Sequence, residues 1–327
     1  MKAAWYMRTG PAKQVLQYGD QPDPTPGAGE VRVRVRVSGI NPSDVKSRAG
    51  ARGPLRFPYQ IPHSDGAGVV DKVGAAVSAS RVGERVYVWN AAWNRQMGSC
   101  AEYVCVPAEQ AVVLPGDIDF TLGAGIGIPV MTACHAVLAD GSVAATTVLV
   151  TGGAGTVGRF AIQLAKWNGA RVIATVSGEA KGQVARAAGA DLVVNYRSDN
   201  VIERVREFTS GQGVDRVVEV EFGGNLGVIK EIVKRGGVIA AYGSMAGRTP
   251  ALPFYELMFK HITLRMLLVY LLSDHERSTA IRYINDALED GALSPLIAAR
   301  FGLDDVVKGH EAVESGTLIG NVLIDLA

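Results

Sequence analysis

The 327-residue sequence has few cysteines, almost no net charge and no long hydrophobic run. Its three cysteines, Cys100, Cys105 and Cys134, are an odd number without paired spacing, which argues against a disulfide framework and favours a reducing cytoplasm. The 33 basic and 32 acidic residues leave a net charge of +1, which indicates neither a nucleic-acid partner nor an anionic membrane.

The sequence also shows no sign of a targeting or membrane-spanning segment. The N-terminal residues contain no apolar stretch of signal-peptide length, and the most apolar segment, residues 262–272, is too short to cross a bilayer and contains Arg265. In contrast, apolar residues make up 48% of the chain and glycine occurs 39 times. We therefore expect a soluble, cytoplasmic protein with a large core, many turns and two domains of ordinary size.

The first third of the chain has the pattern of β structure. Residues 31–37 alternate valine with arginine, which predicts a half-buried strand with its arginines on a solvated face. Further short strands are predicted at 66–73, 83–89 and 101–107, separated by glycine and proline. Short strands of this kind favour a compact, barrel-like domain.

From about residue 123 onward, apolar strands alternate with amphipathic helices. This alternation predicts βαβ units, and therefore an α/β domain with a parallel sheet covered on both faces. The last stretch, residues 276–327, mixes a helix with a final strand, and we expect it to return to the first domain. The predicted strands are 147–151, 171–176, 191–195, 215–220 and 238–242, and the predicted helices are 156–168, 182–188 and 201–209.

A glycine-rich turn follows the first of these strands. The run Gly153-Ala154-Gly155-Thr156-Val157-Gly158 has the spacing G-x-G-x-x-G, with a strand before it and a helix after it. In this context the first glycine permits a tight turn, the second lets a pyrophosphate approach the backbone, and the third lets helix and strand pack closely. The helix N-terminus would then face the phosphates. The alternative is an ordinary glycine turn, but the flanking elements favour a dinucleotide site.

Residues near the tips of the next two strands bear on the choice of cofactor. NAD enzymes place a carboxylate at the end of the second strand, whereas this strand ends at Ser177. Lys181 lies a few residues on, and Tyr196 and Arg197 end the third strand. These groups suit a 2′-phosphate, and we predict NADPH. Glu179 argues against this choice, and solvent exposure is the alternative reading of each residue.

Four more segments, in this order, resemble the quinone oxidoreductase (zeta-crystallin-like) branch of the zinc-free medium-chain dehydrogenase/reductase superfamily. They are 38–44 (SGINPSD), 63–70 (HSDGAGVV), 125–133 (GIGIPVMTA) and 236–244 (GGVIAAYGS). The resemblance implies a GroES-like β-barrel catalytic domain from 1–122 and 273–327, and a Rossmann domain from 123–272. It also implies a homodimer that pairs the edge strand at 262–272, although a plain core strand is an equal alternative.

The resemblance also implies roles for particular residues. Asn41 would lie near the nicotinamide and donate to a substrate oxygen, with a turn-capping role before Pro42 as the alternative. Asp44 and Asp65 would support the site or lie in turns. The other implied cofactor contacts are Thr132, Tyr242, Gly243, Ser244, Leu267 and Asn321.

The residues that would be zinc ligands in related alcohol dehydrogenases are replaced here. The matching positions are Asn41, Ser64 and the cysteine-free stretch 125–129, and His63 stands one residue early. Tetrahedral zinc needs three or four nitrogen or sulfur ligands, so we predict none. Without that Lewis acid, alcohol oxidation is disfavoured, and acceptors that take hydride readily are favoured.

The leading functional hypothesis is therefore NADPH-dependent reduction of small quinones, by one-electron or two-electron transfer. The first alternative is an NADPH-dependent reductase of α,β-unsaturated carbonyls, namely enones, alkenals or enoyl thioesters. A third hypothesis, of another class, is a non-catalytic NADPH-binding sensor or structural protein. Two departures from the family pattern, Lys46 in place of an aromatic and Gly320-Asn321 where a basic residue is common, weaken the quinone and NADPH assignments respectively.

Overall fold

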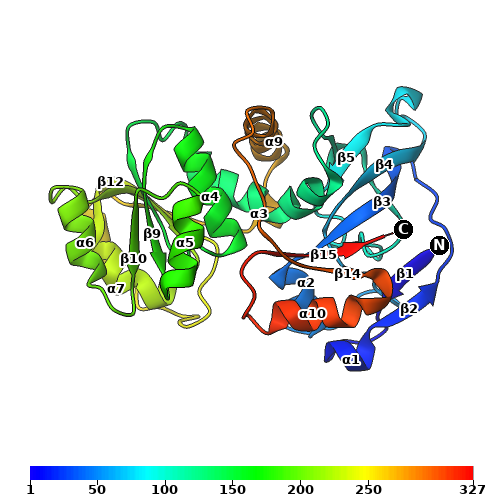
Figure 1. Cartoon of the computed structure of the whole chain (residues 1–327), viewed down its shortest axis with the longest axis horizontal. Coiled ribbons are helices and arrows are strands. Elements are labelled where there is room, and N and C mark those ends of the chain that lie inside the picture. Colours follow the sequence, from blue (N-terminus) through cyan, green and yellow to red (C-terminus); the bar gives the residue numbers. More distant parts are fainter. Residues whose placement is uncertain (327) are drawn as a thin grey trace. The chain divides into compact units, whose positions relative to one another are not determined.

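The structure, a computed structural model, describes residues 1–326 and divides into two compact units (Figure 1). The outer unit comprises Met1–Pro129 and the C-terminal segment from Pro295, and the central unit comprises Val130–Ser294. The sequence predicts divisions at 122/123 and 272/273. In the structure, residues 273–294 group with the central unit, and most of them form helix α9 (Asp274–Glu289).

The outer unit contains a seven-stranded sheet in the order β14-β15-β3-β4-β5-β7, with β6 also paired to β3. Its pairings are antiparallel except for β14 with β15. A separate antiparallel pair joins β1 and β2. The elements of this unit are β1 (Lys2–Trp5), α1 (Ala12–Val15), β2 (Gln17–Asp20), β3 (Glu30–Ile40), α2 (Pro42–Arg48), β4 (Asp65–Val73), β5 (Arg85–Val88), β6 (Tyr103–Pro107), β7 (Ala111–Val113), β14 (Ile297–Gly302), α10 (Val306–Glu314) and β15 (Asn321–Asp325).

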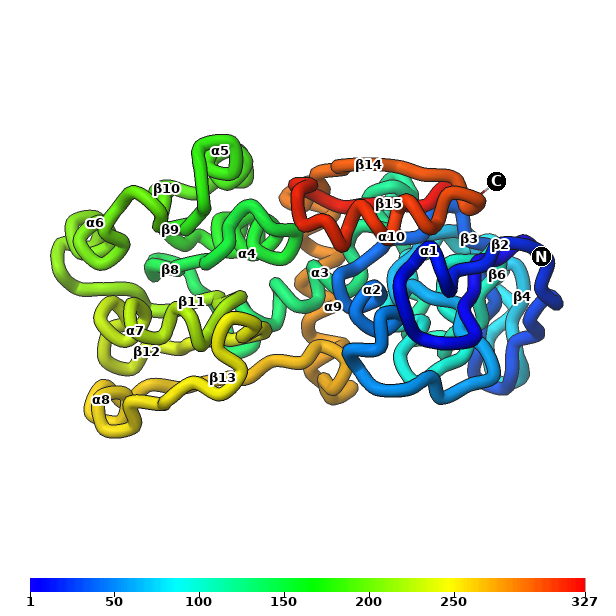
Figure 2. The backbone as a smooth tube through the Cα atoms, turned by 90° about the horizontal axis from the view of Figure 1, so that it is seen from below, coloured from blue at the N-terminus to red at the C-terminus, as the bar shows by residue number. Residues whose placement is uncertain are grey.

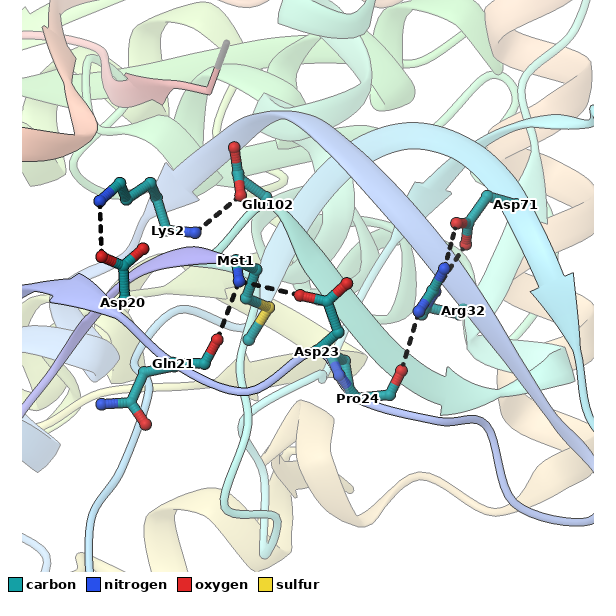
Figure 3. Close-up of polar contacts among 9 residues, drawn as sticks. All are labelled: Met1, Lys2, Asp20, Gln21, Asp23, Pro24, Arg32, Asp71 and Glu102. Carbon is teal, nitrogen blue, oxygen red and sulfur yellow. Dashed lines mark hydrogen bonds and ion pairs between the residues drawn. The ribbon is translucent and has the colours of Figure 1, made fainter.

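The valines of β3 form the core as predicted, but Arg32 on its other face is buried rather than solvated. Its Nε and Nη2 donate to the two Asp71 carboxylate oxygens over 2.9 and 2.5 Å, and its Nη1 donates to the Pro24 carbonyl over 3.1 Å (Figure 3). Its guanidinium also lies 4.6 Å from the centre of the Tyr103 ring. A guanidinium with partners on every side tolerates burial. The prediction of a solvated face is wrong at Arg32 and confirmed at Arg34, which is exposed.

The central unit contains a six-stranded parallel sheet in the order β10-β9-β8-β11-β12-β13, an order that can be followed in Figure 2. The predicted α/β class is therefore confirmed. Strand order reverses at β8, and such switch points are where open parallel sheets bind ligands. The elements are β8 (Thr147–Val150), α4 (Thr156–Trp167), β9 (Arg171–Val176), α5 (Glu179–Ala187), β10 (Leu192–Asn195), α6 (Val201–Phe208), β11 (Val214–Glu219), α7 (Phe222–Ile232), β12 (Val233–Ala241), α8 (Phe254–Phe259), β13 (Thr263–Met266) and α9.

Helix α3 (Phe120–Leu138) joins the two units along the chain and was not predicted as a helix. It is the one described helix that is long and apolar enough to span a membrane by length and composition, yet 89% of its most apolar window is buried inside the protein. Pro129 lies within it and has no N–H to give to the Gly125 carbonyl, four residues earlier. Asn321 supplies the missing donor, because its Nδ2 lies 3.0 Å from that carbonyl oxygen. The Asn321 amide, expected at the cofactor, thus has a structural partner.

A buried polar chain connects α10 to the core of the outer unit. The Nε2 atoms of His63 and His310 lie 2.9 Å apart, and Nδ1 of His63 lies 2.9 Å from the Ser38 hydroxyl. Both rings are fully buried. Burial lowers the pKa of His63 to about 3, and burial together with His63 lowers the pKa of His310. The ring whose Nε2 accepts in this hydrogen bond must be neutral, because a protonated imidazole carries a hydrogen on both nitrogens.

The two histidines predict acid sensitivity of the outer unit. The unfolded chain takes up protons below pH about 6.5 and the folded pair does not, so the contribution of the pair to stability is full above that pH and is lost as pH falls. The loss approaches about 1.4 kcal/mol per pH unit for each histidine. Urea unfolding at pH 5, 6 and 7.5 in a Trp167→Phe background measures it, because the other tryptophans, Trp5, Trp89 and Trp93, lie in the outer unit.

His310→Phe should make the loss of stability at low pH smaller, since one of the two buried histidines is removed while Asp44 and Asp65, whose raised pKa values act in the opposite direction, are kept. The matched control is His275→Gln, which removes an exposed histidine and should leave the pH dependence unchanged. An identical slope in His310→Phe and the parent would show that the pair is not the acid-sensitive element.

Candidate functional site

The glycine-rich turn connects β8 to α4 at the carboxyl edge of the parallel sheet. A methyl group at Gly153 would lie 2.7 Å from the Ala174 Cβ, and one at Gly158 would lie 2.4 Å from the Gly152 carbonyl oxygen. The second glycine of the motif, Gly155, is exposed instead. It is the N-cap of α4 and has no side chain to cap the helix. Close packing thus requires glycine at the first and third positions. The second leaves the helix N-terminus open to an anion.

The first turn of α4 presents the remaining motif residues. Ala154 is buried, and Thr156 and Val157 are half-buried. The turn is tied to the neighbouring strand, because the Gly153 N–H donates to the Thr175 carbonyl over 3.0 Å. This hydrogen bond holds the end of β9 beside the glycine-rich turn.

The residues predicted to select the cofactor lie at this same edge. β9 and β10 are parallel neighbours with Val176 opposite Asn195, so Ser177 and Tyr196 follow on adjacent strand ends. The Tyr196 N–H donates to the Val176 carbonyl over 3.1 Å. Lys181 belongs to the first turn of α5, directly after β9, and is half-buried. The structure therefore brings two hydroxyl groups and one ammonium group to the edge that carries the glycine turn.

Glu179, the residue that favours NAD, has a partner on its own helix. It forms an ion pair with Arg186. Arg197, the fourth residue considered for a phosphate, is exposed, and its N–H donates to the Asn195 Oδ1 over 3.2 Å. The negative charge of Glu179 is thus partly balanced by a cation on its own helix.

At the switch point, between β8 and β11, lies a carboxylate that the sequence did not single out. Glu219 is fully buried at the end of β11; its Oε1 accepts from the Glu221 N–H over 2.5 Å and from Asn225 Nδ2 over 2.9 Å. Burial raises the pKa of Glu219. Thr151, at the end of β8, accepts from the Val220 N–H over 3.0 Å and so joins the two strand ends. A glutamate at a strand end resembles any surface residue in sequence, so only the fold reveals its burial.

Other predicted cofactor residues follow β12 and β13 at the same edge. Gly243 packs against the backbone of Val220, since a methyl group there would lie 2.3 Å from the Val220 carbonyl oxygen. The Ser244 hydroxyl accepts from the Gly223 N–H over 2.9 Å and donates to the Gly247 carbonyl over 2.5 Å. Burial raises the pKa of Tyr242, which therefore stays protonated.

Two further predicted contacts, Thr132 and Leu267, are buried. Leu267 directly follows β13, and its N–H donates to the Ala241 carbonyl over 2.8 Å. Thr132 lies on the part of α3 that belongs to the central unit. The side chain of Leu267 is thus part of the buried core of the unit.

The outer unit holds a separate cluster around Asn41. The Asn41 Nδ2 donates to the Asp65 Oδ2 over 2.7 Å, and the Asn41 N–H donates to the Asp44 Oδ2 over 2.8 Å. The Ile128 N–H lies 2.9 Å from each Asp65 carboxylate oxygen. Both aspartates are buried, so neither lies at the surface. Burial raises the pKa of Asp44 to about 7 and raises that of Asp65 as well, in part because Asp44 is near.

The residues at and beside the positions that match zinc ligands of related alcohol dehydrogenases form hydrogen bonds. Asn41 bonds to Asp65, Ser64 bonds to Asp44, and His63 is joined to His310. Among the described residues, no group of three or more His, Cys, Asp or Glu side chains is placed to hold a metal ion. An amide and a hydroxyl do not replace thiolate and imidazole ligands, so this donor set does not fit a catalytic zinc.

Two family models match the chain. The alcohol dehydrogenase GroES-like domain matches residues 27–116, and the zinc-binding dehydrogenase model matches residues 156–286. The first lies in the outer unit and the second in the central unit. These matches support the predicted pairing of a GroES-like domain with a nucleotide-binding sheet.

The relatives of the chain extend over nearly its whole length. Human quinone oxidoreductase is 30% identical over 297 residues, which cover 90% of this chain and 88% of the relative. The 2-haloacrylate reductase of a Burkholderia species is 30% identical over 309 residues, with 92% of each chain covered. The solved structure of Escherichia coli quinone oxidoreductase complexed with NADPH has a TM-score of 0.86 at 26% identity and covers 100% of both chains.

The GroES-like unit and the parallel sheet opened by a glycine turn define an oxidoreductase of the medium-chain dehydrogenase/reductase class. Within this class, the chain belongs to the quinone oxidoreductase branch. The resemblance seen in the sequence, the predicted fold class and the prediction of an enzyme are thereby confirmed.

The packing at the turn predicts opposite effects for two glycine substitutions. Gly158→Ala should destabilise the central unit by about 1–3 kcal/mol, because its methyl group meets backbone atoms that cannot rotate away. Gly227→Ala, at an exposed position of α7 with no atom within 4 Å of the added methyl, should stabilise it by about 0.5–1 kcal/mol. Urea unfolding followed by circular dichroism measures both, and a neutral Gly158→Ala would contradict the close approach of helix and turn.

Proposed function

We propose that this chain is an NADPH-dependent reductase of small quinones that transfers a hydride or electrons without zinc. The observation that carries the proposal is the convergence, at one edge of the parallel sheet, of the glycine turn with Ser177, Lys181 and Tyr196. Support comes also from the Escherichia coli relative, whose structure was solved with NADPH.

NADPH, when bound, supplies the hydride. The N–H groups at the start of α4 would bind its pyrophosphate, helped by the positive end of the helix dipole. Lys181 would pair with the 2′-phosphate, and the hydroxyls of Ser177 and Tyr196 would donate to it. Thr132 and the Tyr242-Gly243-Ser244 turn would contact the nicotinamide half.

In this proposal Asn41 acts on the acceptor. An acceptor that takes a hydride gains negative charge on oxygen, and an amide N–H directed at that oxygen stabilises the charge as it develops. The raised pKa values of Asp44 and Asp65 arise from burial, and both carboxylates already accept hydrogen bonds from Asn41. The proton that completes the reduction would therefore come from water.

A second candidate is the reduction of α,β-unsaturated carbonyl compounds. The Burkholderia relative is named for reduction of a 2-haloacrylate, an activated double bond beside a carboxylate. Lys46, exposed on α2, stands where related enzymes carry an aromatic residue, and a cation suits such an acid better than a neutral quinone. The third candidate, a non-catalytic NADPH-binding protein, shares the cofactor site and predicts no turnover.

The proposal predicts turnover of small ortho- and para-quinones with NADPH, followed by loss of nicotinamide absorbance. Lys181→Ala should raise KM for NADPH by about 10- to 100-fold and leave KM for NADH nearly unchanged, because only the 2′-phosphate loses a charged partner. Lys13→Ala, an exposed lysine of the outer unit, is the matched control and should change neither value.

Each outcome separates the candidates. Turnover limited to enones, haloacrylates or enoyl thioesters would assign the chain to the double-bond reductases. NADPH binding without turnover of any acceptor would favour the non-catalytic reading. A preference for NADH that Lys181→Ala does not alter would contradict the phosphate site.

We also propose that two copies of the chain pair through β13. In the described part of the chain, β13 ends the parallel sheet with one neighbour only, β12. The residues around it are apolar and exposed, with Met266 76% and Leu271 69% accessible. An open, apolar sheet edge is stabilised when a second copy adds its own strand.

Met266→Lys should convert such a dimer to monomers, because charge on an edge strand opposes edge-to-edge pairing. Size-exclusion chromatography with light scattering measures the mass of each variant. Met7→Lys, a substitution at an exposed methionine of the outer unit, is the control and should leave the dimer intact. A wild-type chain that is monomeric at micromolar concentration would refute the pairing.

A further inference from the structure

Asp65 has no role in the proposed reaction, yet its carboxylate is 1% exposed and two N–H donors point at it. Burying a carboxylate without a cation is costly, and the raised pKa of Asp65 reflects that cost. The surrounding backbone is shaped to admit it. A methyl group at Gly127 would lie 2.3 Å from its Oδ1, so only glycine fits at that turn of α3.

Asn41 is the N-cap of α2, which begins at Pro42. Its N–H donates to the Asp44 Oδ2 over 2.8 Å, and its carbonyl accepts from the Asp44 N–H over 3.0 Å. In this capping box the Asn41 side chain also accepts from the Asp44 N–H, so its oxygen faces the start of the helix. The NH2 end of the amide is left for another group to direct.

Asp65 directs that NH2 end. Its Oδ2 accepts from the Asn41 Nδ2, and both of its oxygens accept from the Ile128 N–H, so the NH2 end of Asn41 faces Asp65. The observed 2.7 Å distance joins Nδ2 to Oδ2. One hydrogen of Nδ2 is thereby used, and the second stays available for another acceptor.

We propose that Asp65 is a positioning residue that fixes the Asn41 carboxamide so that its second N–H is presented to the oxygen of the substrate. The Ile128 N–H holds the carboxylate in turn, so α3 sets the direction in which the amide is offered. This inference rests on the role of Asn41 in the proposed function. Asp65 itself does not contact the reacting atoms.

A double-mutant cycle in the full-length chain tests the proposal. Asn41→Ala and Asp65→Asn should each lower kcat by about 100-fold with little change in KM, which is the usual cost of losing one donor to a developing oxyanion. Because Asp65 acts only through Asn41, the double variant should be no slower than Asn41→Ala. Asp71→Asn, on the same strand but paired with Arg32, is the matched control and should keep near-wild-type kcat.

The outcomes distinguish this inference from the function on which it rests. Wild-type kcat in Asn41→Ala would refute the role of Asn41 and the positioning role with it. A loss in Asn41→Ala with wild-type kcat in Asp65→Asn would refute the positioning role alone. Losses that multiply to about 10⁴-fold in the double variant would mean that Asp65 acts on its own.

A measurement on the wild-type chain covers the case in which Asp65→Asn does not fold. In protein labelled with ¹⁵N at asparagine, the Asn41 side-chain signal is identified by its absence from Asn41→Ala. One of its two protons should resonate downfield and exchange slowly with water, since it is bonded to a buried carboxylate. Two equivalent, rapidly exchanging protons would overturn the proposal.

Discussion

The buried carboxylate of Asp65 is the constraint on which the arrangement of the outer unit depends. Without a cation beside it, its oxygens depend on hydrogen bonds from the N–H groups of Asn41 and Ile128. Those two donors come from different elements, the N-cap of α2 directly after β3 and the middle of α3. The carboxyl group therefore joins these elements, and displacement of either would leave a buried acceptor without its partner.

Helix α3 can approach the carboxylate because of its composition. Gly127 leaves room for Asp65, and Gly39 on β3 leaves room for the Ala124 carbonyl, which a methyl group would approach to 2.3 Å. Pro129 has no N–H to donate to the Gly125 carbonyl, but the Asn321 side-chain amide donates to it instead. The glycines in and opposite α3 thus allow the backbone of this helix to pack directly against neighbouring elements of the outer unit. The same composition in isolation indicates a loop.

This explains which parts of the fold the sequence could predict. The parallel sheet was predictable because each strand is a buried apolar run and each glycine stop is local, as at Gly169 after α4. Helix α3 was not predictable, since glycine and proline lower helix propensity and only tertiary contacts compensate. The boundary at Ser273 was also misread, because a capping box with Glu276 starts α9 there within the central unit.

The candidate site divides along the same line. Motif spacing and strand ends predicted the glycine turn, Ser177, Lys181 and Tyr196, since neighbouring parallel strands bring their ends together whatever their loops do. Burial, however, cannot be read from a single residue. Arg32, Glu219 and Asp65 are charged in sequence and enclosed in the structure, each by partners distant along the chain or contributed by a turn.

The two units meet different physical requirements in the proposed function. The central unit would bind phosphate without side-chain charge at the turn itself, through the helix dipole and free N–H groups. The outer unit would hold one amide in one orientation, and the hydrogen bond from Asn41 to Asp65 serves this purpose. At the positions that match zinc ligands of related alcohol dehydrogenases, Asn41 and Ser64 bond to the two buried aspartates. In the proposed function, a directed amide N–H would stabilise the developing charge that a Lewis acid stabilises in those enzymes.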